Sequence, residues 1–376
     1  MYTRILEKTI KDNLFKGKIL ILYGARQVGK TTLIRKIYDE YSKSKIILSG
    51  DNPTVQENLK NRDPITLHQY FNNSSLLIID EAQAIENIGR TIKTYHDVYK
   101  DVQIILTGSS SFDLSNKIRE PLTGRSREYI MYPLSVQEIV NTDGLHVYKS
   151  REENFFRFGY YPGIINEGED TIKQDLKMLE NNTFYKDILA LENIKKPKIL
   201  QDIIRFLAFN LGSVVTSSNI SREIGATIKT VERYTDILEK MFVIKKLYAY
   251  SNNKSNEIKK GYKIYFVDIG LRNAIIDSFS LIQNRIDIGQ IFENIFVIEK
   301  IKNNEYNMQF ANTFFWQGER GLEVDYLEES NGEIRGYECK WKNRKSKGVK
   351  IFEENYKDRK AKVIMIYKEN YLEYLL

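Results

Sequence analysis

The chain is poor in the residues that disulfides and structural zinc sites require. Its 376 residues include three histidines and one cysteine, Cys339. A single cysteine excludes a disulfide framework and is typical of a reducing compartment, and so few cysteines and histidines make a structural zinc site unexpected. The first residues lack the apolar segment of a secretory signal, and no apolar run is long enough to cross a bilayer. We therefore expect a soluble, cytoplasmic protein with no membrane partner.

The overall composition is that of a globular protein. Hydrophobic residues make up 42%, which excludes a mainly disordered chain. The length suffices for about two or three domains. The net charge of +7 allows an acidic partner such as nucleic acid, although charge alone does not establish one.

The most informative stretch has four free positions between two glycines, followed by a lysine and a hydroxyl residue. It reads Gly24, Ala25, Arg26, Gln27, Val28, Gly29, Lys30, Thr31 and Thr32. The apolar residues 19–23 before it predict a buried parallel strand, and residues 33–38 continue as a helix. In this context the pattern predicts a phosphate-binding loop, whose backbone N–H groups bind ATP while Lys30 reaches its β- and γ-phosphates and Thr31 binds Mg²⁺. The alternative, a glycine-rich turn without nucleotide, does not explain why strand, loop and helix agree.

Two carboxylates follow a second buried strand. Four aliphatic residues, 76–79, lead directly to Asp80 and Glu81. A strand that delivers an aspartate to the carboxyl edge of the sheet, beside the phosphate loop, places it to bind Mg²⁺. Glu81 would then orient or deprotonate the attacking water. The alternative is a strand that ends in solvated acids.

Polar residues also follow a third strand, 102–106. Thr107 and Ser109 would lie near the γ-phosphate and sense it, although hydroxyls at this position also serve as helix caps. Arg125 precedes a last core strand, 128–132. It would stabilise transition-state charge on the nucleotide of a neighbouring subunit in a homo-oligomer, or else it is a surface arginine. Strands that alternate with helices predict an α/β fold with a mostly parallel sheet.

Four motifs together resemble one family: Gly-Ala-Arg-Gln-Val-Gly-Lys-Thr-Thr, Ile-Ile-Asp-Glu-Ala-Gln, Leu-Thr-Gly-Ser-Ser-Ser, and Leu-Thr-Gly-Arg with Tyr-Pro-Leu-Ser. They look like the prokaryotic AAA-type ATPases that carry a winged-helix region and a C-terminal nuclease-like domain of unknown function. The resemblance implies phosphate binding by Gly29, Lys30 and Thr31. It also implies metal and water positioning by Asp80 and Glu81, a sensor around Ser109, and Arg125 as arginine finger.

The middle of the chain predicts a helical lid followed by a helix-turn-helix. Helices over 199–211 and 217–225, and a third from residue 227, precede strands 243–250 and 262–267 that suit the wing of a winged helix. On the third helix, the exposed candidates for double-stranded DNA are Lys229, Thr230 and Arg233. Lys254, Lys259 and Lys260 in the wing would neutralise phosphates. The alternative is a winged helix that contacts protein only.

Residues 322–341 predict a β-hairpin around the two-residue turn Asn331-Gly332. Counting outward from this turn places Asp325 opposite Glu338. The period of two assigns Glu323, Asp325, Glu338 and Lys340 to one face, and it assigns an apolar set to the other face. That apolar set is Leu322, Val324, Tyr326, Tyr337, Cys339 and Trp341.

Carboxylates that face each other across a ladder repel unless a cation lies between them, and Mg²⁺ is the candidate. Asp325, Glu338 and Lys340 resemble the core of PD-(D/E)XK nucleases, and Glu293 matches the acidic residue on the first helix of that fold. The resemblance implies metal binding by the three carboxylates and a catalytic role for Lys340 in orienting water. The alternative is a hairpin with a solvated charged face.

Taken together, these patterns predict an α/β chain in four parts. They are a P-loop AAA-type ATPase core (1–140), a helical lid (141–196), a winged helix-turn-helix (197–282) and a PD-(D/E)XK, restriction-endonuclease-like α/β domain (283–376). Three functions stay open. The first is a Mg²⁺-dependent ATPase coupled to a DNA-contacting winged helix. The second is a nucleotide-switched regulator or scaffold whose C-terminal domain does not cut. The third is an ATP-gated DNA endonuclease.

Overall fold

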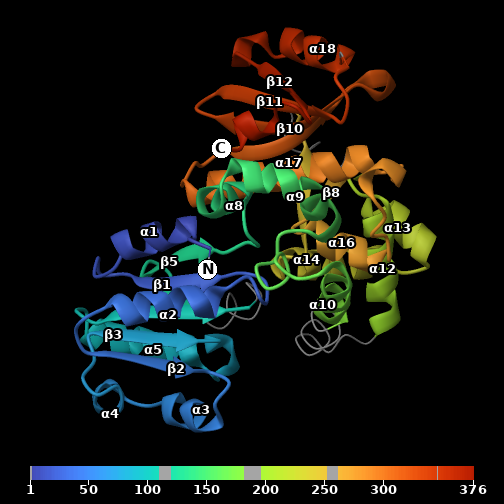
Figure 1. The fold of residues 1–376 in the computed structure, drawn as a ribbon. Helices are drawn as coiled ribbons and strands as arrows, with labels where there is room; N and C mark the ends of the chain where they lie inside the picture. Colours follow the sequence, from blue (N-terminus) through green and yellow to red (C-terminus); the bar gives the residue numbers. More distant parts are fainter. Residues whose placement is uncertain (1, 110–119, 182–195, 252–260, 345) are drawn as a thin grey trace. The chain divides into compact units, whose positions relative to one another are not determined.

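The chain forms two compact units. The computed structural model describes residues 2–109, 120–181, 196–251, 261–344 and 346–376. The first unit comprises residues 1–134 with 240–242, and the second comprises residues 135–239 with 243–376 (Figure 1). Each unit contains its own sheet, of five strands in the first and seven in the second.

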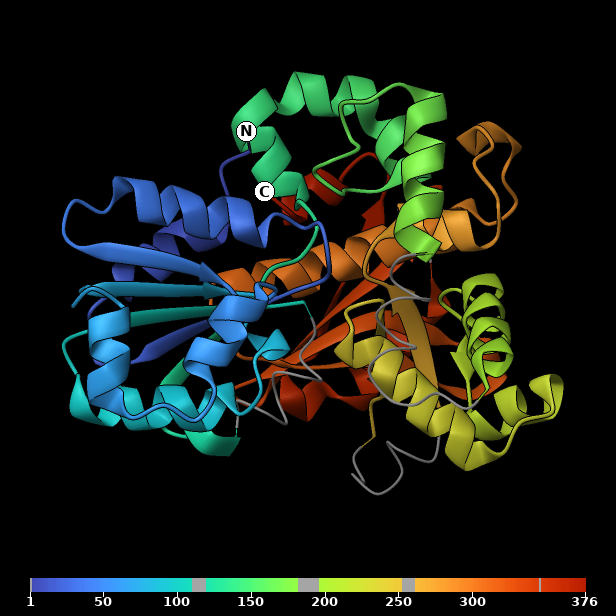
Figure 2. The same ribbon diagram turned by 90° about the horizontal axis from the view of Figure 1, so that it is seen from below.

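The first unit is built on a five-stranded sheet with the order β2-β3-β4-β1-β5, in which every pairing is parallel. Its strands are β1 (Ile19–Tyr23), β2 (Lys45–Ser49), β3 (Leu76–Asp80), β4 (Gln103–Gly108) and β5 (Ser126–Ile130). Helices lie on both faces (Figure 2), and every residue of β1 is buried, as expected for a strand covered on two sides. The predicted α/β fold with a parallel sheet is confirmed.

The helices of this unit begin at recognisable sequence signals. They are α1 (Ile5–Asp12), α2 (Lys30–Glu40), α3 (Pro53–Leu59), α4 (Pro64–Tyr70), α5 (Ile88–Val98) and the short α7 (Glu120–Leu122) and η1 (Ala82–Ala84). Asn52 and Asp63 cap α3 and α4, each with proline at the first helical position. Helix α2 follows Gly29 directly, so its N-terminus carries the phosphate loop.

Parallel pairing decides which ends of the strands meet. The loop after β1, Asp80 at the end of β3 and Ser109 after β4 all lie at the carboxyl edge of the sheet. The opposite, amino edge holds the residues that enter the strands. There the Ile19 N–H donates to the Arg125 carbonyl at 2.9 Å. The predicted nucleotide residues and Arg125 therefore lie at opposite edges of one sheet.

The second unit is built on a seven-stranded mixed sheet with the order β12-β11-β10-β9-β7-β8-β6. Its strands are β6 (Val214–Val215), β7 (Ile244–Ala249), β8 (Tyr262–Phe266), β9 (Asn312–Gln317), β10 (Glu323–Ser330), β11 (Glu333–Lys340) and β12 (Lys362–Tyr367). The pairs β11–β12 and β7–β9 are parallel, and the others are antiparallel. The strands of the predicted wing, β7 and β8, thus continue into the sheet of the C-terminal hairpin, while the division of the chain at 140, 196 and 282 stays a prediction.

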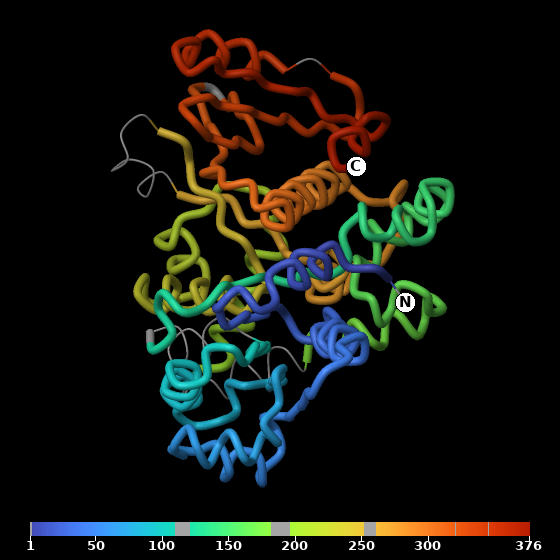
Figure 3. The backbone as a smooth tube through the Cα atoms, turned by 90° about the vertical axis from the view of Figure 1, so that its left-hand side faces the viewer, coloured from blue at the N-terminus to red at the C-terminus, as the bar shows by residue number. Residues whose placement is uncertain are grey.

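The helices of the second unit cover this sheet and extend from it. They are α8 (Val136–Asp143), α9 (Leu145–Phe158), α10 (Glu169–Asn181), α12 (Pro197–Phe209), α13 (Ser217–Ile224), α14 (Ile228–Lys240), α16 (Ile269–Ile275), α17 (Ile288–Tyr306) and α18 (Lys347–Asn355), with the single turns η4 (Ile282–Asn284), η5 (Glu319–Gly321), η6 (Lys357–Arg359) and η7 (Tyr371–Tyr374). The long helix α17 contacts β8 and β11, and Figure 3 shows it, in orange, beside the red C-terminal strands.

The C-terminal hairpin has the predicted turn, and it has the predicted register from Ser330–Glu333 to Tyr326–Tyr337, but it does not have the predicted faces. Asn331 and Gly332 have positive φ, and Ser330 pairs with Glu333. However, the pairing of β10 with β9 shifts register between Val324 and Leu327, so these two residues join the same apolar cluster. The assignment of Val324 and Tyr326 to one face was wrong, because a β-bulge interrupts the alternation of side chains. Tyr326 contacts Tyr337 and Asn304 instead.

Candidate functional site

The phosphate loop is held by close backbone contacts. At Gly24, with φ +153°, a Cβ atom would lie 2.2 Å from the Met131 carbonyl oxygen, so only glycine fits. The Nζ of Lys30 donates to the carbonyls of Gly24 at 2.9 Å and Ala25 at 2.8 Å, which places the ammonium over the loop. Of the other predicted loop residues, Val28 is buried, whereas Arg26, Gln27 and Thr32 are exposed.

A buried arginine that the motif did not indicate also forms a hydrogen bond with this loop. Arg4, which precedes α1, donates from Nη1 to the Val28 carbonyl at 2.8 Å and from Nη2 to the Tyr132 carbonyl at 2.6 Å. It therefore ties the loop to the segment after β5. An arginine ahead of an amphipathic helix carries no sequence signal for such a role.

Asp80 is bound by hydroxyl groups from two neighbouring elements. Its Oδ2 accepts from the Thr31 hydroxyl at 2.8 Å, and its Oδ1 accepts a short hydrogen bond from the Thr107 hydroxyl. Thr107 also accepts from the Glu81 backbone N–H at 3.1 Å. A carboxylate and a hydroxyl beside a phosphate loop are the hard oxygen donors that Mg²⁺ prefers. Asp80 and Thr31 therefore fit a nucleotide-bound Mg²⁺ ion.

Glu81 has an unusual backbone conformation that its neighbours impose. Its φ of +50° lies in the left-handed region. Gly50, which follows β2, packs against it so closely that a Cβ there would lie 2.3 Å from the Glu81 carbonyl oxygen. The Glu81 carboxylate accepts from Gln83 Nε2 at 2.5 Å, and the same nitrogen lies 3.2 Å from Ser109 Oγ. The two predicted residues Glu81 and Ser109 are thus linked through Gln83.

Arg125 does not lie at this edge. Its guanidinium forms a bidentate ion pair with Asp97, at the end of α5, over 2.7 Å and 3.1 Å. Since it enters β5 at the amino edge of the sheet, it does not line the phosphate loop of its own unit. Its action on a neighbouring subunit stays a prediction.

The predicted metal ligands of the second unit surround a lysine. Lys263, on β8, is buried among them, with Nζ at 2.8 Å from Asp325 Oδ1, 3.0 Å from Glu293 Oε1 and 3.5 Å from Glu323 Oε2. The Tyr265 hydroxyl donates to Glu293 at 2.7 Å. We call these five residues, together with Glu338, the carboxylate cluster. The lysine ammonium thus contacts Asp325 and Glu293, two of the three predicted metal ligands, while Glu338 pairs with Lys340.

The predicted metal ligands Asp325, Glu338 and Glu293 each contact a lysine, and metal binding by them stays a prediction. Glu338 pairs with Lys340 at 2.7 Å, while Asp325 and Glu293 share Lys263. Across the described ranges, no group of three or more histidine, cysteine, aspartate or glutamate side chains is arranged to hold a metal ion. The sequence signal for this contact is the single lysine within the apolar strand Tyr262–Phe266.

Burial and charge shift the pKa values in this cluster. Burial, and then the charge of Asp325, raise the pKa of Glu293 to about 7 and that of Glu338 to about 8. Burial disfavours the charged form of Lys263, but the surrounding carboxylates raise its pKa well above the ordinary value. Burial also disfavours the charged form of Lys340, but the charges of Asp325 and Glu338 outweigh this effect and raise its pKa. Both lysines therefore stay protonated, which suits ion pairing and not proton abstraction from water.

The candidate DNA-contacting residues lie on α14. Lys229 and Arg233 are exposed and Thr230 is half-buried, whereas Val231 and Leu238 are buried. The Thr227 hydroxyl accepts from the Thr230 N–H at 3.2 Å at the start of the helix. The predicted wing residues Lys254, Lys259 and Lys260 lie outside the described residues.

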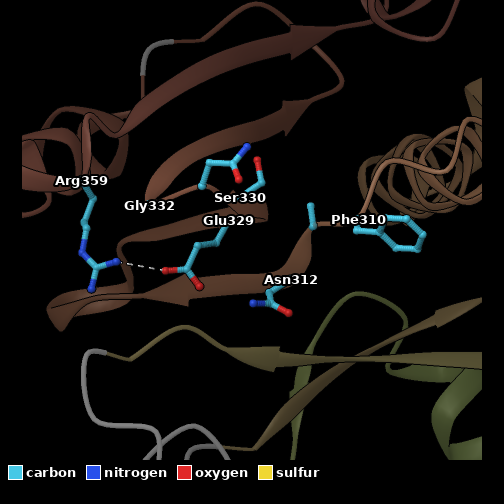
Figure 4. Close-up of a pocket in the computed structure, with 8 residues that line it drawn as sticks. Phe310, Asn312, Glu329, Ser330, Gly332 and Arg359 are labelled. Atoms are coloured by element: carbon cyan, nitrogen blue, oxygen red, sulfur yellow. Dashed lines mark hydrogen bonds and ion pairs between the residues drawn. The ribbon is translucent and has the colours of Figure 1, made fainter.

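A pocket of about 440 Å³ lies at the tip of the C-terminal hairpin, lined by Phe310, Asn312 and the 329–332 turn. Arg359 and Glu329 form an ion pair of 3.3 Å across its wall (Figure 4). None of the predicted site residues lines this pocket.

None of the helices in the described ranges combines the length and apolar character that a membrane span requires.

Comparison with protein-family models divides the chain into three parts. Residues 16–140 match the model of an AAA domain. Residues 151–281 match one domain of unknown function (DUF8612), and residues 288–374 match another (DUF4143). The two latter matches carry no function.

The chain is also similar to several uncharacterized proteins. One from Methanocaldococcus jannaschii is 26% identical over 91% of this chain and 83% of its own length. Relatives from Haemophilus influenzae (25%; 76% and 74%) and Mycobacterium tuberculosis (24%; 88% and 72%) follow. Among solved structures, the Pif1 helicase from Candida albicans aligns over 48% of each chain with 14% identity and a TM-score of 0.27, which is too low to indicate a shared fold or function.

The match over residues 16–140 coincides with the five-stranded parallel sheet, the phosphate loop and the acids at its carboxyl edge. The chain therefore contains an AAA domain of the P-loop NTPase type.

Proposed function

We propose that this chain hydrolyses ATP with Mg²⁺ at the carboxyl edge of the five-stranded sheet. The observation that carries the proposal is the hydrogen bond of 2.8 Å between Thr31 and Asp80, which brings together the two residues expected to bind the metal. Bound Mg²⁺ would neutralise charge on the phosphates. The loop N–H groups and Lys30 would bind the phosphates, and Asp80 and Thr31 would hold the ion.

Glu81 is the residue best placed to act on water. It follows Asp80 directly, and its backbone is fixed by Gly50 and Thr107, so its carboxylate is directed by the fold rather than by chance. A carboxylate at this position orients the attacking water and accepts its proton. Gln83 holds the Glu81 carboxylate, and through Ser109 it connects that carboxylate to the end of β4.

Two substitutions test the proposal. Glu81→Gln keeps the side-chain volume but removes the base, so ATP binding should persist while kcat falls by about 10²–10⁴-fold. Lys30→Ala should instead weaken ATP binding itself. Phosphate release and titration with a fluorescent ATP analogue measure the two effects separately. The matched control is Glu86→Gln, which removes a carboxylate whose ion pair is with Lys60 and should change neither value. Hydrolysis at the wild-type rate by Glu81→Gln would refute the role of Glu81.

We further propose that the exposed face of α14 contacts double-stranded DNA. Lys229 and Arg233 lie about one helical turn apart on the solvent side. The negative charge of Asp236 on the same helix is paired with Lys246, which lessens its effect on a phosphate backbone. The second helix of a helix-turn-helix inserts in this way into the major groove.

DNA binding is tested by anisotropy of a labelled duplex at rising salt. Lys229→Ala and Arg233→Ala should each weaken binding and lower the salt slope by about 1. Lys198→Ala, an exposed lysine at the start of α12, serves as control. If wild type does not retain DNA, the nucleotide-switched scaffold becomes the better description. We do not propose an ATP-gated endonuclease, because the arrangement around Lys263 does not support it.

A further inference from the structure

The carboxylate cluster of the second unit contains its own positive charge, Lys263. Lys263 Nζ has three carboxylate oxygens within 3.5 Å, from Asp325, Glu293 and Glu323. These carboxylates come from β10 and α17, whereas the lysine comes from β8. The ammonium thus occupies the centre of the acidic group.

Burial makes this pairing strong and specific. The side chains of Lys263 and Asp325 are each only 1% exposed. A buried charge without a partner is very unfavourable, so loss of either group should destabilise the folded chain. Asp325 is further fixed because its Oδ2 accepts from the Cys339 backbone N–H at 2.9 Å. A backbone hydrogen bond therefore fixes the position of the Asp325 carboxylate beside Lys263.

Lys263 is also fixed by its strand. Its residue pairs with Leu247 of β7 on one side and with Val214 of β6 on the other. The backbone of Lys263 is therefore held between two strands of the sheet. Mg²⁺ binds carboxylates at about 2.0–2.1 Å in octahedral geometry, and a divalent ion this close to an ammonium would be repelled.

We infer that Lys263 is the resident cation of the carboxylate cluster, and that it excludes a divalent ion from Asp325 and Glu293. The C-terminal sheet then resembles a nuclease core in its acids but uses them as an internal ion pair. This ion pair joins β8, from the segment matched by one domain model, to α17 and β10, from the segment matched by the next. The two segments form one folded unit.

Manganese binding tests this inference on the full chain without nucleotide. All proteins carry Asp80→Asn, so that the nucleotide site contributes no carboxylate. Electron paramagnetic resonance of free Mn²⁺ reports binding. The Asp80→Asn parent and the same chain with Asp325→Asn should give identical titrations. Adding Lys263→Ala should create one Mn²⁺ site, at least about tenfold tighter than any binding in the parent, and Asp325→Asn should abolish it.

Lys246→Ala is the matched control, since Lys246 is also buried and paired with a carboxylate, Asp236, and it should create no site. Where Lys263→Ala does not fold, Lys263→Met retains the apolar stem. The comparison of the parent with Glu293→Gln needs no lysine variant and should show no lost site. A Mn²⁺ site in the parent that Asp325→Asn or Glu293→Gln removes would overturn the inference, as would a folded Lys263 variant that gains no site.

Discussion

Each of the two units contains an aspartate and a glutamate close together, and the surroundings of the two pairs differ. Asp80 and Glu81 stand at the end of a strand, half-buried, and are bound by hydroxyl and amide groups that carry no charge. Asp325 and Glu338 lie within paired strands, 1% exposed, and each is bound by a lysine. The first arrangement leaves negative charge available for a cation that arrives with a nucleotide. The second has its cation built in. A pair of acids after or within an apolar strand thus becomes a site or an internal ion pair according to what the rest of the fold places beside it.

The largest expected difference comes from making the same substitution in both groups. Asp80→Asn should abolish Mg²⁺-dependent hydrolysis and leave the free energy of unfolding nearly unchanged. Asp325→Asn should leave hydrolysis unchanged and lower the free energy of unfolding by about 3–5 kcal/mol, because a buried lysine loses a partner. Phosphate release and urea denaturation measure the two effects. If Asp325→Asn were as stable as wild type, the ion pair would not have the structural role assigned here.

A smaller effect is expected from the contact that fixes Glu81. Gly50→Ala would bring a Cβ atom to 2.3 Å from the Glu81 carbonyl oxygen, so the backbone of Glu81 must move. Misplacement of a catalytic group by about 1 Å costs roughly a hundredfold, so kcat should fall by about that factor while the Kd for ATP changes little. Gly168→Ala, where a Cβ meets no atom within 4 Å and φ lies outside the left-handed region, should leave kcat near the wild-type value. An equal loss of ATP affinity in Gly50→Ala would show that the loop, and not Glu81, depends on Gly50.

The buried cluster should also make stability depend on pH. Burial, and then the charge of Asp325, raise the pKa of Glu338 from 4.5 to about 8, while Lys340 opposes this and Glu323 adds to it. The folded state binds the Glu338 proton more tightly than the unfolded state does. The contribution of protonated Glu338 to the free energy of unfolding is therefore complete below pH 4.5 and is lost as the pH rises through about 8. Glu338→Gln should flatten this decline in the midpoint of thermal unfolding. Glu354→Gln, on the exposed face of α18, should leave it unchanged. The same slope in wild type and Glu338→Gln would assign the decline to other groups.

The smallest effect is expected at Arg125. Its ion pair with Asp97 is exposed, and such pairs contribute little to stability. Arg125→Ala should therefore show no measurable change in thermal unfolding, and the Kd for ATP should match wild type because the residue lies at the far edge of the sheet. Turnover measured at rising protein concentration then tests its action on a neighbouring subunit. Markedly weaker ATP binding by Arg125→Ala in dilute protein would contradict its placement.

Much of the first unit could be predicted because its signals are contiguous. The residues of the loop Gly24–Thr32 and the strand that ends in Asp80 are neighbours in the chain, and parallel pairing brings their ends to one edge. The turn Asn331-Gly332 likewise determined its own register. The bulge between Val324 and Leu327 could not be predicted, because it arises from the partner strand β9 and not from the hairpin.

By itself, the sequence determined the phosphate loop, the acids that accompany it and the hairpin turn, because each of these is a local pattern with its own backbone geometry. Only the tertiary structure decided that Arg4 and Gly50 support the first site, and that Lys263 lies among the acids of the second. The physical reason is range. Contacts between neighbours in the chain leave a pattern in the spacing of residues. Lys263 lies 62 residues before Asp325, and no spacing pattern connects the two.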